Sequence, residues 1–282
     1  MNRRWSIAVA AVIALVGVVP ATAAQAAPAA PPQAMGWYLA LGDSLAAGYQ
    51  PGAGDDLTGG YVGGVLAAVK AKTPKTKLVN IACSGETVVT MVNGGRCTYD
   101  EGTQLAEALH FLKAHGKFTR LVTIDIGAND VQRCVSRAPL AIDARCIEEG
   151  LGDVATLLPT ALKQIRAAAP HAKIVVANYY NPFLAAYLAG SAGQAIAEHS
   201  IDLQAQLNGI IAGAATTANA DVADVATAFK STDSTMTSLP GVGQVPTNVA
   251  TICMWTWMCL LGDIHANDTG YAVMATTVAG RL

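Results

Sequence analysis

The sequence predicts an α/β fold in which helices cover both faces of a parallel sheet. Short apolar segments alternate with longer segments of helical periodicity, which is typical of β-α-β units. The composition is 52% hydrophobic and 13% charged, and much of the apolar content is Ala and Val. Such a composition favours closely packed helices over a buried sheet and argues against disorder. With 282 residues, the chain is long enough for one large domain.

Five short apolar segments are predicted to be strands. Gly42 stops the first of them and Gly127 stops the third, because glycine weakens a strand and allows a turn. In chain order the predicted strands are Trp37–Leu41, Lys77–Ala82, Arg120–Ile126, Ala172–Asn178 and Asp221–Ala226.

Five segments with helical spacing lie between and after these strands. Gly116 ends the second of them and Pro170 closes the third. The predicted helices are Tyr61–Ala71, Leu105–Ala114, Leu151–Ala169, Ser191–Ala215 and Asp268–Gly280. Gly and Pro are frequent in Gln50–Gly64, and Ser231–Leu261 lacks a clear periodicity, so both are predicted to be long loops.

The N-terminus has the pattern of a secretory signal peptide. Arg3 and Arg4 precede an apolar run, Ile7–Val19, which is followed by an Ala-rich stretch. A membrane anchor is the alternative, but this run is shorter than the ~20 residues that a spanning helix needs. We therefore expect a signal peptide over residues 1–26, a linker over 27–35, one domain over 36–282, and secretion of the mature protein.

The net charge of −2 argues against a nucleic-acid partner, because phosphate binding requires clustered Lys and Arg. The chain is expected to be a monomer that uses neither a cofactor nor a metal.

Six cysteines follow the signal peptide: Cys83, Cys97, Cys134, Cys146, Cys253 and Cys259. In a secreted chain they indicate disulfides, for which the sequence alone permits fifteen pairings. Their local spacing favours the pairing of neighbours, so that each disulfide closes one loop. A zinc site is the alternative, but no two cysteines have the C-x₂-C spacing.

Four short motifs lie at predicted strand ends or just before the last helix. Ser44 follows the first strand in LALGDSLAAGY, Gly85 follows the second in NIACSGET, and Asn129 follows the third in IDIGAND. His265 precedes the last helix in LLGDIHANDTGY. In open α/β sheets, ligands bind at the carboxyl edge where strand order reverses. If the strand order is 2-1-3-4-5, the first three motifs lie side by side.

These residue types together indicate nucleophilic catalysis. A serine hydroxyl needs a base to take its proton, and histidine is the usual base near neutral pH. The oxyanion that forms needs preorganised donors, which the Asn129 amide and the backbone N–H groups of Gly85 and Ser44 can supply. Singly, Ser44 would be read as a helix cap, Gly85 as a turn residue and Asn129 as a loop residue.

The four motifs resemble the signature blocks of the SGNH hydrolase superfamily, also called GDSL lipases and esterases. They occur in the family's order between Leu39 and Tyr271. The resemblance implies a flavodoxin-like, three-layer α/β/α fold and metal-independent ester hydrolysis. It implies Ser44 as nucleophile, His265 as base, and Gly85 and Asn129 as oxyanion donors. Cysteines in sequential pairs resemble those of secreted actinobacterial lipases in this superfamily.

The residue that orients His265 remains open in the sequence. The family usually carries an acid three residues before the histidine, and here that position is Gly262. Asp263, two residues before His265, is one candidate, although a side chain at this spacing can point away from the ring. The main-chain carbonyl of Gly262 is the other candidate.

Trp255 and Trp257 lie in an unusual apolar segment, Val249–Leu261, just before the histidine. They are predicted either to bind the acyl group of a substrate or to pack a disulfide-closed loop on the core. Near Asn129, Asp125 is interpreted as part of a strand and Asp130 as the cap of the next helix.

The predicted activity is hydrolysis of carboxylic esters, of an acyl or lipid type, through an acyl-serine intermediate. The expected partner is therefore a small-molecule or lipid ester, with transient contact to a lipid interface. A carbohydrate acetyl esterase and an acyltransferase are the alternatives among enzymes. A binding protein on the same scaffold is the alternative outside enzymes, and it would be expected to lack Ser44 or His265.

Overall fold

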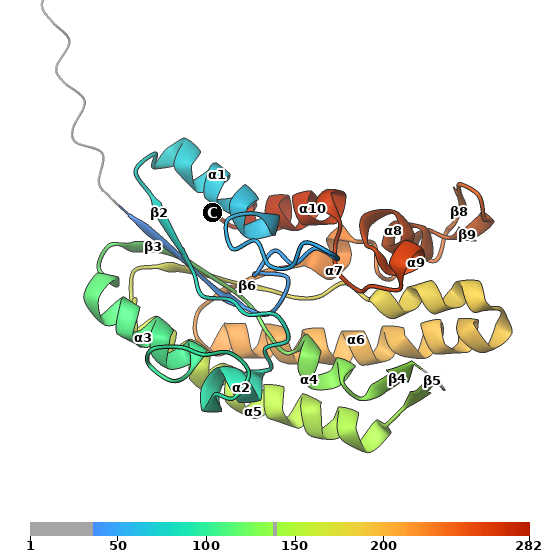
Figure 1. The fold of residues 1–282 in the computed structure, drawn as a ribbon, viewed down its shortest axis with the longest axis horizontal. Coiled ribbons are helices and arrows are strands. Elements are labelled where there is room, and N and C mark those ends of the chain that lie inside the picture. The colour runs from blue at the N-terminus through green and yellow to red at the C-terminus, as the bar shows by residue number, and fades with distance from the viewer. Residues whose placement is uncertain (1–35, 138–139) are drawn as a thin grey trace, which may run out of the picture. The chain divides into compact units, whose positions relative to one another are not determined.

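The computed structural model describes residues 36–137 and 140–282, and its centre is a five-stranded parallel sheet (Figure 1). The strand order is β2-β1-β3-β6-β7, which confirms the predicted order and the α/β class. The strands are β1 (Trp37–Gly42), β2 (Lys77–Asn80), β3 (Thr119–Asp125), β6 (Lys173–Ala177) and β7 (Asp221–Ala223). The predicted signal peptide and linker, residues 1–35, lie outside the described residues.

Strand β1 is buried on both faces and fixes the arrangement of its neighbours. It pairs with β2 from Trp37↔Lys77 to Ala40↔Asn80, and with β3 up to Gly42↔Asp125. Five of its six residues are buried, as expected for a strand covered on both sides. The carboxyl ends of β2, β1 and β3 therefore lie side by side at one edge of the sheet.

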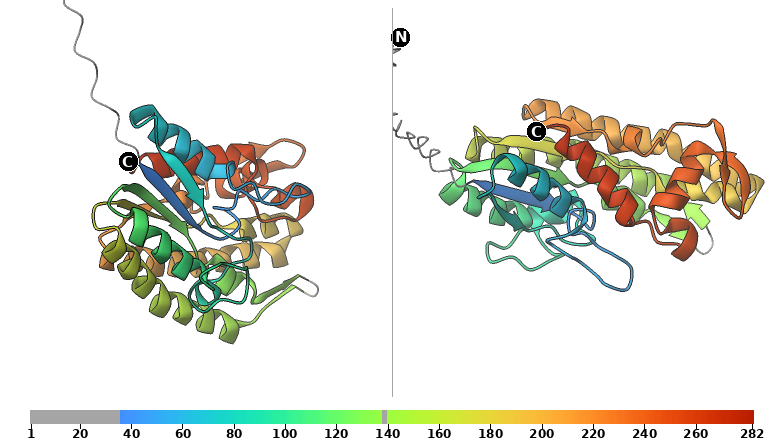
Figure 2. Two further views of the ribbon diagram at one scale, coloured as in Figure 1. Left: turned by 60° about the vertical axis from the view of Figure 1, so that its left-hand side comes forward. Right: turned by 90° about the horizontal axis from the view of Figure 1, so that it is seen from above.

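Helices cover both faces of the sheet and make a three-layer α/β/α fold (Figures 1 and 2). Helices α1 and α10 pack against each other on one face, and α3, α5 and α6 form the layer on the other face. The helices of these layers are α1 (Gly60–Lys72), α3 (Gln104–His115), α5 (Ala144–Ala168), α6 (Ser191–Thr217) and α10 (Asp268–Ala279).

Helix α5 begins seven residues before the predicted start at Leu151. Asp143 caps it, because the Asp143 carboxylate accepts the backbone N–H of Cys146 at 3.1 Å. The helix also continues through Pro159 without ending. Asp143 is a typical N-cap residue and indicates this start, but the apolar periodicity becomes clear only later in the segment.

The stretch Ser231–Leu261, predicted to be a loop, is largely regular structure. It contains a hairpin of β8 (Met236–Leu239) and β9 (Gly243–Pro246), followed by two short helices. These helices are α8 (Thr247–Trp255) and α9 (Met258–Leu261). The elements are too short to show a hydrophobic period.

Other short elements connect the layers and were not predicted. They are the helices α2 (Val88–Asn93), α4 (Ala128–Gln132) and α7 (Val225–Ala228), the 3₁₀ helix η1 (Pro182–Ala189), and the hairpin strands β4 (Val135–Arg137) and β5 (Leu140–Ile142). The last sheet strand ends at Ala223 and not at Ala226, because the Asp224 carboxylate caps α7 by accepting the backbone N–H of Thr227.

Three disulfides close local loops, in the neighbour pairing that the spacing favoured. They join Cys83 to Cys97, Cys134 to Cys146, and Cys253 to Cys259. Within the described part of the chain, no helix has the length and apolar character needed to cross a membrane.

Leu158, fully buried in α5, provides a test of the packing between the sheet and its helical layer. The change Leu158→Ala is expected to lower the free energy of unfolding by about 2–5 kcal/mol, because it leaves a cavity in a close-packed core. Urea denaturation measures this change. Leu260→Ala is the control, since that side chain is 74% exposed and its loss should cost no more than about 0.5 kcal/mol.

Candidate active site

Ser44 lies in a tight turn directly after β1, at the carboxyl edge of the sheet. Gly42 adopts a φ of 137°, and a Cβ there would lie 2.4 Å from the carbonyl oxygen of Asp125. Only glycine therefore lets β1 approach β3 this closely before the turn. Ser44 Oγ lies 2.8 Å from Nε2 of His265, so its hydroxyl meets a base and does not cap a helix.

His265 lies between α9 and α10 and is oriented by Asp263. Its Nδ1 is 2.6 Å from Oδ1 of Asp263, and the same oxygen accepts the backbone N–H of His265 at 2.9 Å. This second hydrogen bond folds the carboxylate back over the next two residues, which is how an acid two positions away reaches the ring. The geometry favours the Asp263 carboxylate over the Gly262 carbonyl as the group at Nδ1.

The loop that carries His265 is held on several sides. The backbone N–H of Trp257 donates to the carbonyl of His265 at 3.0 Å, and the hydroxyl of Tyr180 donates to the carbonyl of Ile264 at 2.7 Å. The ring of Tyr49 lies 4.4 Å from the imidazole between centroids. These contacts fix the imidazole relative to the turn of Ser44.

The two predicted oxyanion donors stand on neighbouring loops. Asn129 lines the same cavity as Ser44 and His265, and its Nδ2 donates one hydrogen bond to the carbonyl of Glu86 at 2.9 Å. The amide nitrogen carries a second hydrogen that remains for another acceptor. Gly85 directly precedes Glu86 and has a φ of 80°, but it is not among the residues that line this cavity.

Gly85 lies under the guanidinium of Arg96. A Cβ at Gly85 would lie 2.4 Å from an Arg96 nitrogen, and the Arg96 Nε donates to the carbonyl of Ser84 at 3.0 Å. The positive φ favours glycine at the position, whereas the Arg96 guanidinium is the end of a flexible side chain and can move aside.

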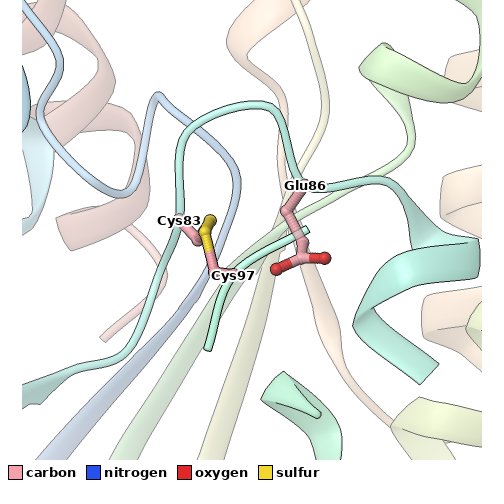
Figure 3. A group of neighbouring side chains, drawn as sticks. All are labelled: Cys83, Glu86 and Cys97. Carbon is pink, nitrogen blue, oxygen red and sulfur yellow. A yellow bond between two sulfur atoms is a disulfide. The ribbon is translucent and has the colours of Figure 1, made fainter. Parts of the chain in front are cut away.

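The Cys83–Cys97 disulfide and the Glu86 side chain flank the Gly85 loop (Figure 3). The two sulfurs and a carboxylate oxygen of Glu86 lie within 4.8 Å of one another. These are metal-binding residue types, but the sulfurs are bonded to each other and so are not thiolates. Burial raises the pKa of the Glu86 carboxyl, which accepts a hydrogen bond from Tyr99 Oη at 3.1 Å. The cluster serves to clip the loop.

A pair of buried carboxyl groups, Asp43 and Asp125, lies directly behind Ser44. Asp43 accepts the backbone N–H of Leu45 at 2.9 Å and the hydroxyl of Tyr179 at 2.7 Å, while Asp125 accepts the hydroxyl of Tyr61 at 2.5 Å. Burial raises the pKa of both acids, and the neighbouring Asp43 charge raises that of Asp125 further. Both effects disfavour the charged form, so the pair takes up a proton more readily than an exposed acid does.

The interpretation of Asp130 as the cap of the next helix is wrong, because Asp143 caps that helix, α5. Asp130 lies inside α4, and its carboxylate accepts the backbone N–H of Val88 at the start of α2, at 2.9 Å. It joins two helices that meet below Asn129 and Glu86. Burial raises its pKa to about 6.

Trp255 and Trp257 do not line the cavity at Ser44. Trp255 packs edge-on against Phe229, with ring centroids 5.4 Å apart, and the Trp257 indole N–H donates to Gln50 Oε1 at 2.6 Å. The structure thus favours the packing interpretation of this segment. Trp257 acts on the site only by holding the loop of His265.

The cavity at Ser44, called here the Ser44 cavity, is small, with a volume of ≈ 20 Å³. Its lining residues are Asp43, Ser44, Leu45, Ala128, Asn129, Gln132, Tyr179, Tyr180, Pro182, Ile264 and His265. Sequence reasoning missed Tyr179 and Tyr180. They follow the fourth strand, β6, so the rule that placed the first three motifs at strand ends would have found them.

The three-layer fold, with a serine, a histidine and an acid joined at its carboxyl edge, defines an SGNH-type hydrolase. The sequence model of the GDSL-like lipase/acylhydrolase family matches residues 40–273. The chain belongs to this family and is a carboxylic ester hydrolase. No curated protein matches the chain in a sequence comparison.

Solved structures with the same fold include two lipases. The extracellular lipase from Streptomyces rimosus is 22% identical, with a TM-score of 0.55, over 86% of this chain and 99% of that one. A putative GDSL-like lipase from Parabacteroides merdae is 16% identical, with a TM-score of 0.54, over 87% and 94% of the two chains. At these identities the likeness concerns the fold.

Replacement of Asp263 tests which group orients His265. Asp263→Asn is expected to lower kcat on an ester by roughly 10⁴-fold, as for the equivalent change in other triads, because an amide favours the wrong imidazole tautomer. Steady-state kinetics on a chromogenic ester measure the effect, with Asp202→Asn on the exposed side of α6 as control. Retention of most activity in Asp263→Asn would assign the orienting role to the Gly262 carbonyl.

The raised pKa of Asp130 predicts a pH dependence of stability. Burial raises the pKa of its carboxyl from the usual 3.8 to about 6 in the folded chain. Between these pH values the folded state therefore binds more protons than the unfolded state. The free energy of unfolding should therefore fall as pH rises from about 4 to about 6. Asp130→Asn should remove this fall. Between pH 4 and pH 8, the free energy of unfolding of the variant should therefore rise by up to about 3 kcal/mol relative to that of wild type. Urea denaturation at the two pH values measures it, and an unchanged pH profile would contradict it.

Proposed function

We propose that this ester hydrolase is an exported enzyme that cleaves acyl or lipid esters through an acyl-serine intermediate. The observation that carries the proposal is the continuous chain of contacts from Ser44 Oγ through His265 to the Asp263 carboxylate. A nucleophile, a base and an orienting acid at these distances make up the activated serine of hydrolases.

The reaction begins with attack of Ser44 Oγ on the ester carbonyl while His265 Nε2 takes the hydroxyl proton. The negative charge that develops on the carbonyl oxygen is met by the Asn129 amide and by the backbone N–H groups of Gly85 and Ser44. His265 then gives its proton to the departing alkoxide, which leaves as an alcohol. A water molecule repeats the sequence on the acyl-serine and releases the carboxylic acid.

Asp263 stabilises the imidazolium that exists between these proton transfers. Its carboxylate accepts from Nδ1–H and so keeps Nε2 directed at Ser44. The buried Asp43 carboxyl interacts electrostatically with His265, which lowers the pKa of Asp43 against the larger effect of burial. The side chains of His265 and Asp263 are only 16% and 24% exposed, which limits solvent screening of both contacts.

Export is supported by the signal-peptide pattern at the N-terminus and by the three disulfides, which persist in oxidising compartments. One protein with the same fold, from Streptomyces rimosus, is an extracellular lipase.

The test is hydrolysis of p-nitrophenyl esters from acetate to palmitate by the mature protein and by Ser44→Ala. The variant should lose at least about 10⁴-fold in kcat, because it has no nucleophile. Ser191→Ala, an exposed serine at the start of α6, is the matched control and should keep full activity. Equal turnover by wild type and Ser44→Ala would rule out the serine mechanism, and a preference for acetylated sugars would favour the carbohydrate esterase.

A further inference from the structure

A separate apolar cavity lies beside the Ser44 cavity, between α4, α5, η1 and α6. Its lining includes no charged side chain among the described residues and only three polar ones, Gln132, Ser200 and Gln204. The remaining lining residues are Val131, Val135, Ile142, Ile147, Leu151, Phe183, Ile196, Leu203 and Leu207. A cavity of this composition accepts hydrocarbon and offers almost nothing to a sugar or a charged group.

The apolar cavity adjoins the Ser44 cavity. Gln132 lines both, and Pro182 of the Ser44 cavity is followed directly by Phe183 of the apolar one. Gln132 therefore stands at the boundary, and a group attached to the carbon that Ser44 attacks would enter the apolar space past its side chain.

On its outer side the apolar cavity borders an open groove. Val135, Phe183 and Ile196 line both, so these side chains form the wall between them. The groove has a volume of ≈ 570 Å³, against ≈ 40 Å³ for the apolar cavity, and it is lined further by Leu188, Met258 and Leu261. Leu261 is 58% exposed, which is unusual for a large apolar side chain without a partner.

We propose that the apolar cavity holds the acyl chain of the substrate ester and that Phe183 sets the chain length. This inference rests on the proposed function of Ser44. Phe183 lines both the apolar cavity and the groove, so removal of its ring opens the cavity to the groove, which then receives the remainder of a longer chain.

The acyl chain fits the cavity better than the alcohol does. The departing alcohol must receive a proton from His265 Nε2, so it leaves on the side of the imidazole. The cavity opens at Gln132, which is on the same short helix as the oxyanion donor Asn129. In a tetrahedral intermediate, the alcohol lies on the side of the imidazole, so the substituent on the side of Asn129 and Gln132 is the acyl group.

The closed volume indicates a short or medium chain for the wild-type protein. Apolar cavities of about 150 Å³ hold a benzene ring, so ≈ 40 Å³ accommodates only a few methylene groups. Each methylene that becomes buried should raise kcat/KM by about fourfold, and further methylenes beyond Phe183 should add nothing.

The experiment compares two ester series in three variants. In the first series, p-nitrophenyl esters vary the acyl chain from acetate to palmitate; in the second, n-alkyl acetates vary the alcohol over the same lengths. Phe183→Ala should shift the acyl optimum to longer chains and raise kcat/KM for palmitate at least tenfold. Leu203→Trp should fill the cavity and lower kcat/KM for butyrate relative to acetate at least tenfold.

Ile210→Trp is the matched control. Ile210 is on the same helix as Leu203, is half-buried, and does not line the cavity, so the acyl profile should stay that of wild type. Thermal unfolding checks that each variant folds. Phe183→Ala and Leu203→Trp are expected to change the acyl-chain preference in opposite directions, so either variant alone tests the proposal if the other does not fold.

Two results would overturn the proposal. One is an acyl profile that is the same in wild type and in the folded cavity variants. The other is a shift confined to the n-alkyl acetate series, which would place the alcohol in the cavity. In both cases, Ser44-dependent turnover of p-nitrophenyl acetate would leave the proposed function standing. If wild type cleaves no ester, the proposed function fails instead.

Discussion

The contact between the Ser44 hydroxyl and the His265 imidazole joins residues 221 positions apart. The surrounding structure holds these two residues in place. The sheet fixes the serine, because β1 is central, buried and ended by a turn that only Gly42 permits. The histidine has no strand to hold it. Its loop depends on backbone and side-chain hydrogen bonds from Trp257 and Tyr180, and on the packing of α10 against α1.

Buried acids form the floor of this site. Asp43, Asp125, Glu86 and Asp130 have exposed fractions of at most 2%, and burial raises the pKa of each. Each accepts hydrogen bonds from backbone or hydroxyl groups on a neighbouring element, which offsets part of the cost of burial. These hydrogen bonds tie the turn of Ser44 to its neighbouring elements, and the raised pKa of each acid means that its ionisation lowers the free energy of unfolding as pH rises.

The sequence predicts the sheet well because glycine and proline end its apolar segments, and the order of the motifs places Ser44 and Asn129 together. It leaves Asp263 open, because whether a carboxylate two residues away reaches the ring depends on a local turn and not on spacing. It also misses the apolar cavity: the walls come from α4, α5, η1, α6 and a hairpin, and no single segment shows them. The two tryptophans stand out in the sequence, yet one mainly packs and the other holds a loop.

The distance along the chain between Ser44 and His265 determines how long after the serine the histidine is synthesised. Ribosomes add ~5–20 residues per second, so Ser44 emerges on the order of ten to forty seconds before His265. During that interval the serine has no base, and its hydroxyl is no more reactive than that of any other serine. On the proposed mechanism the chain is therefore inactive until the segment that contains His265 has been made and has folded against the turn of Ser44.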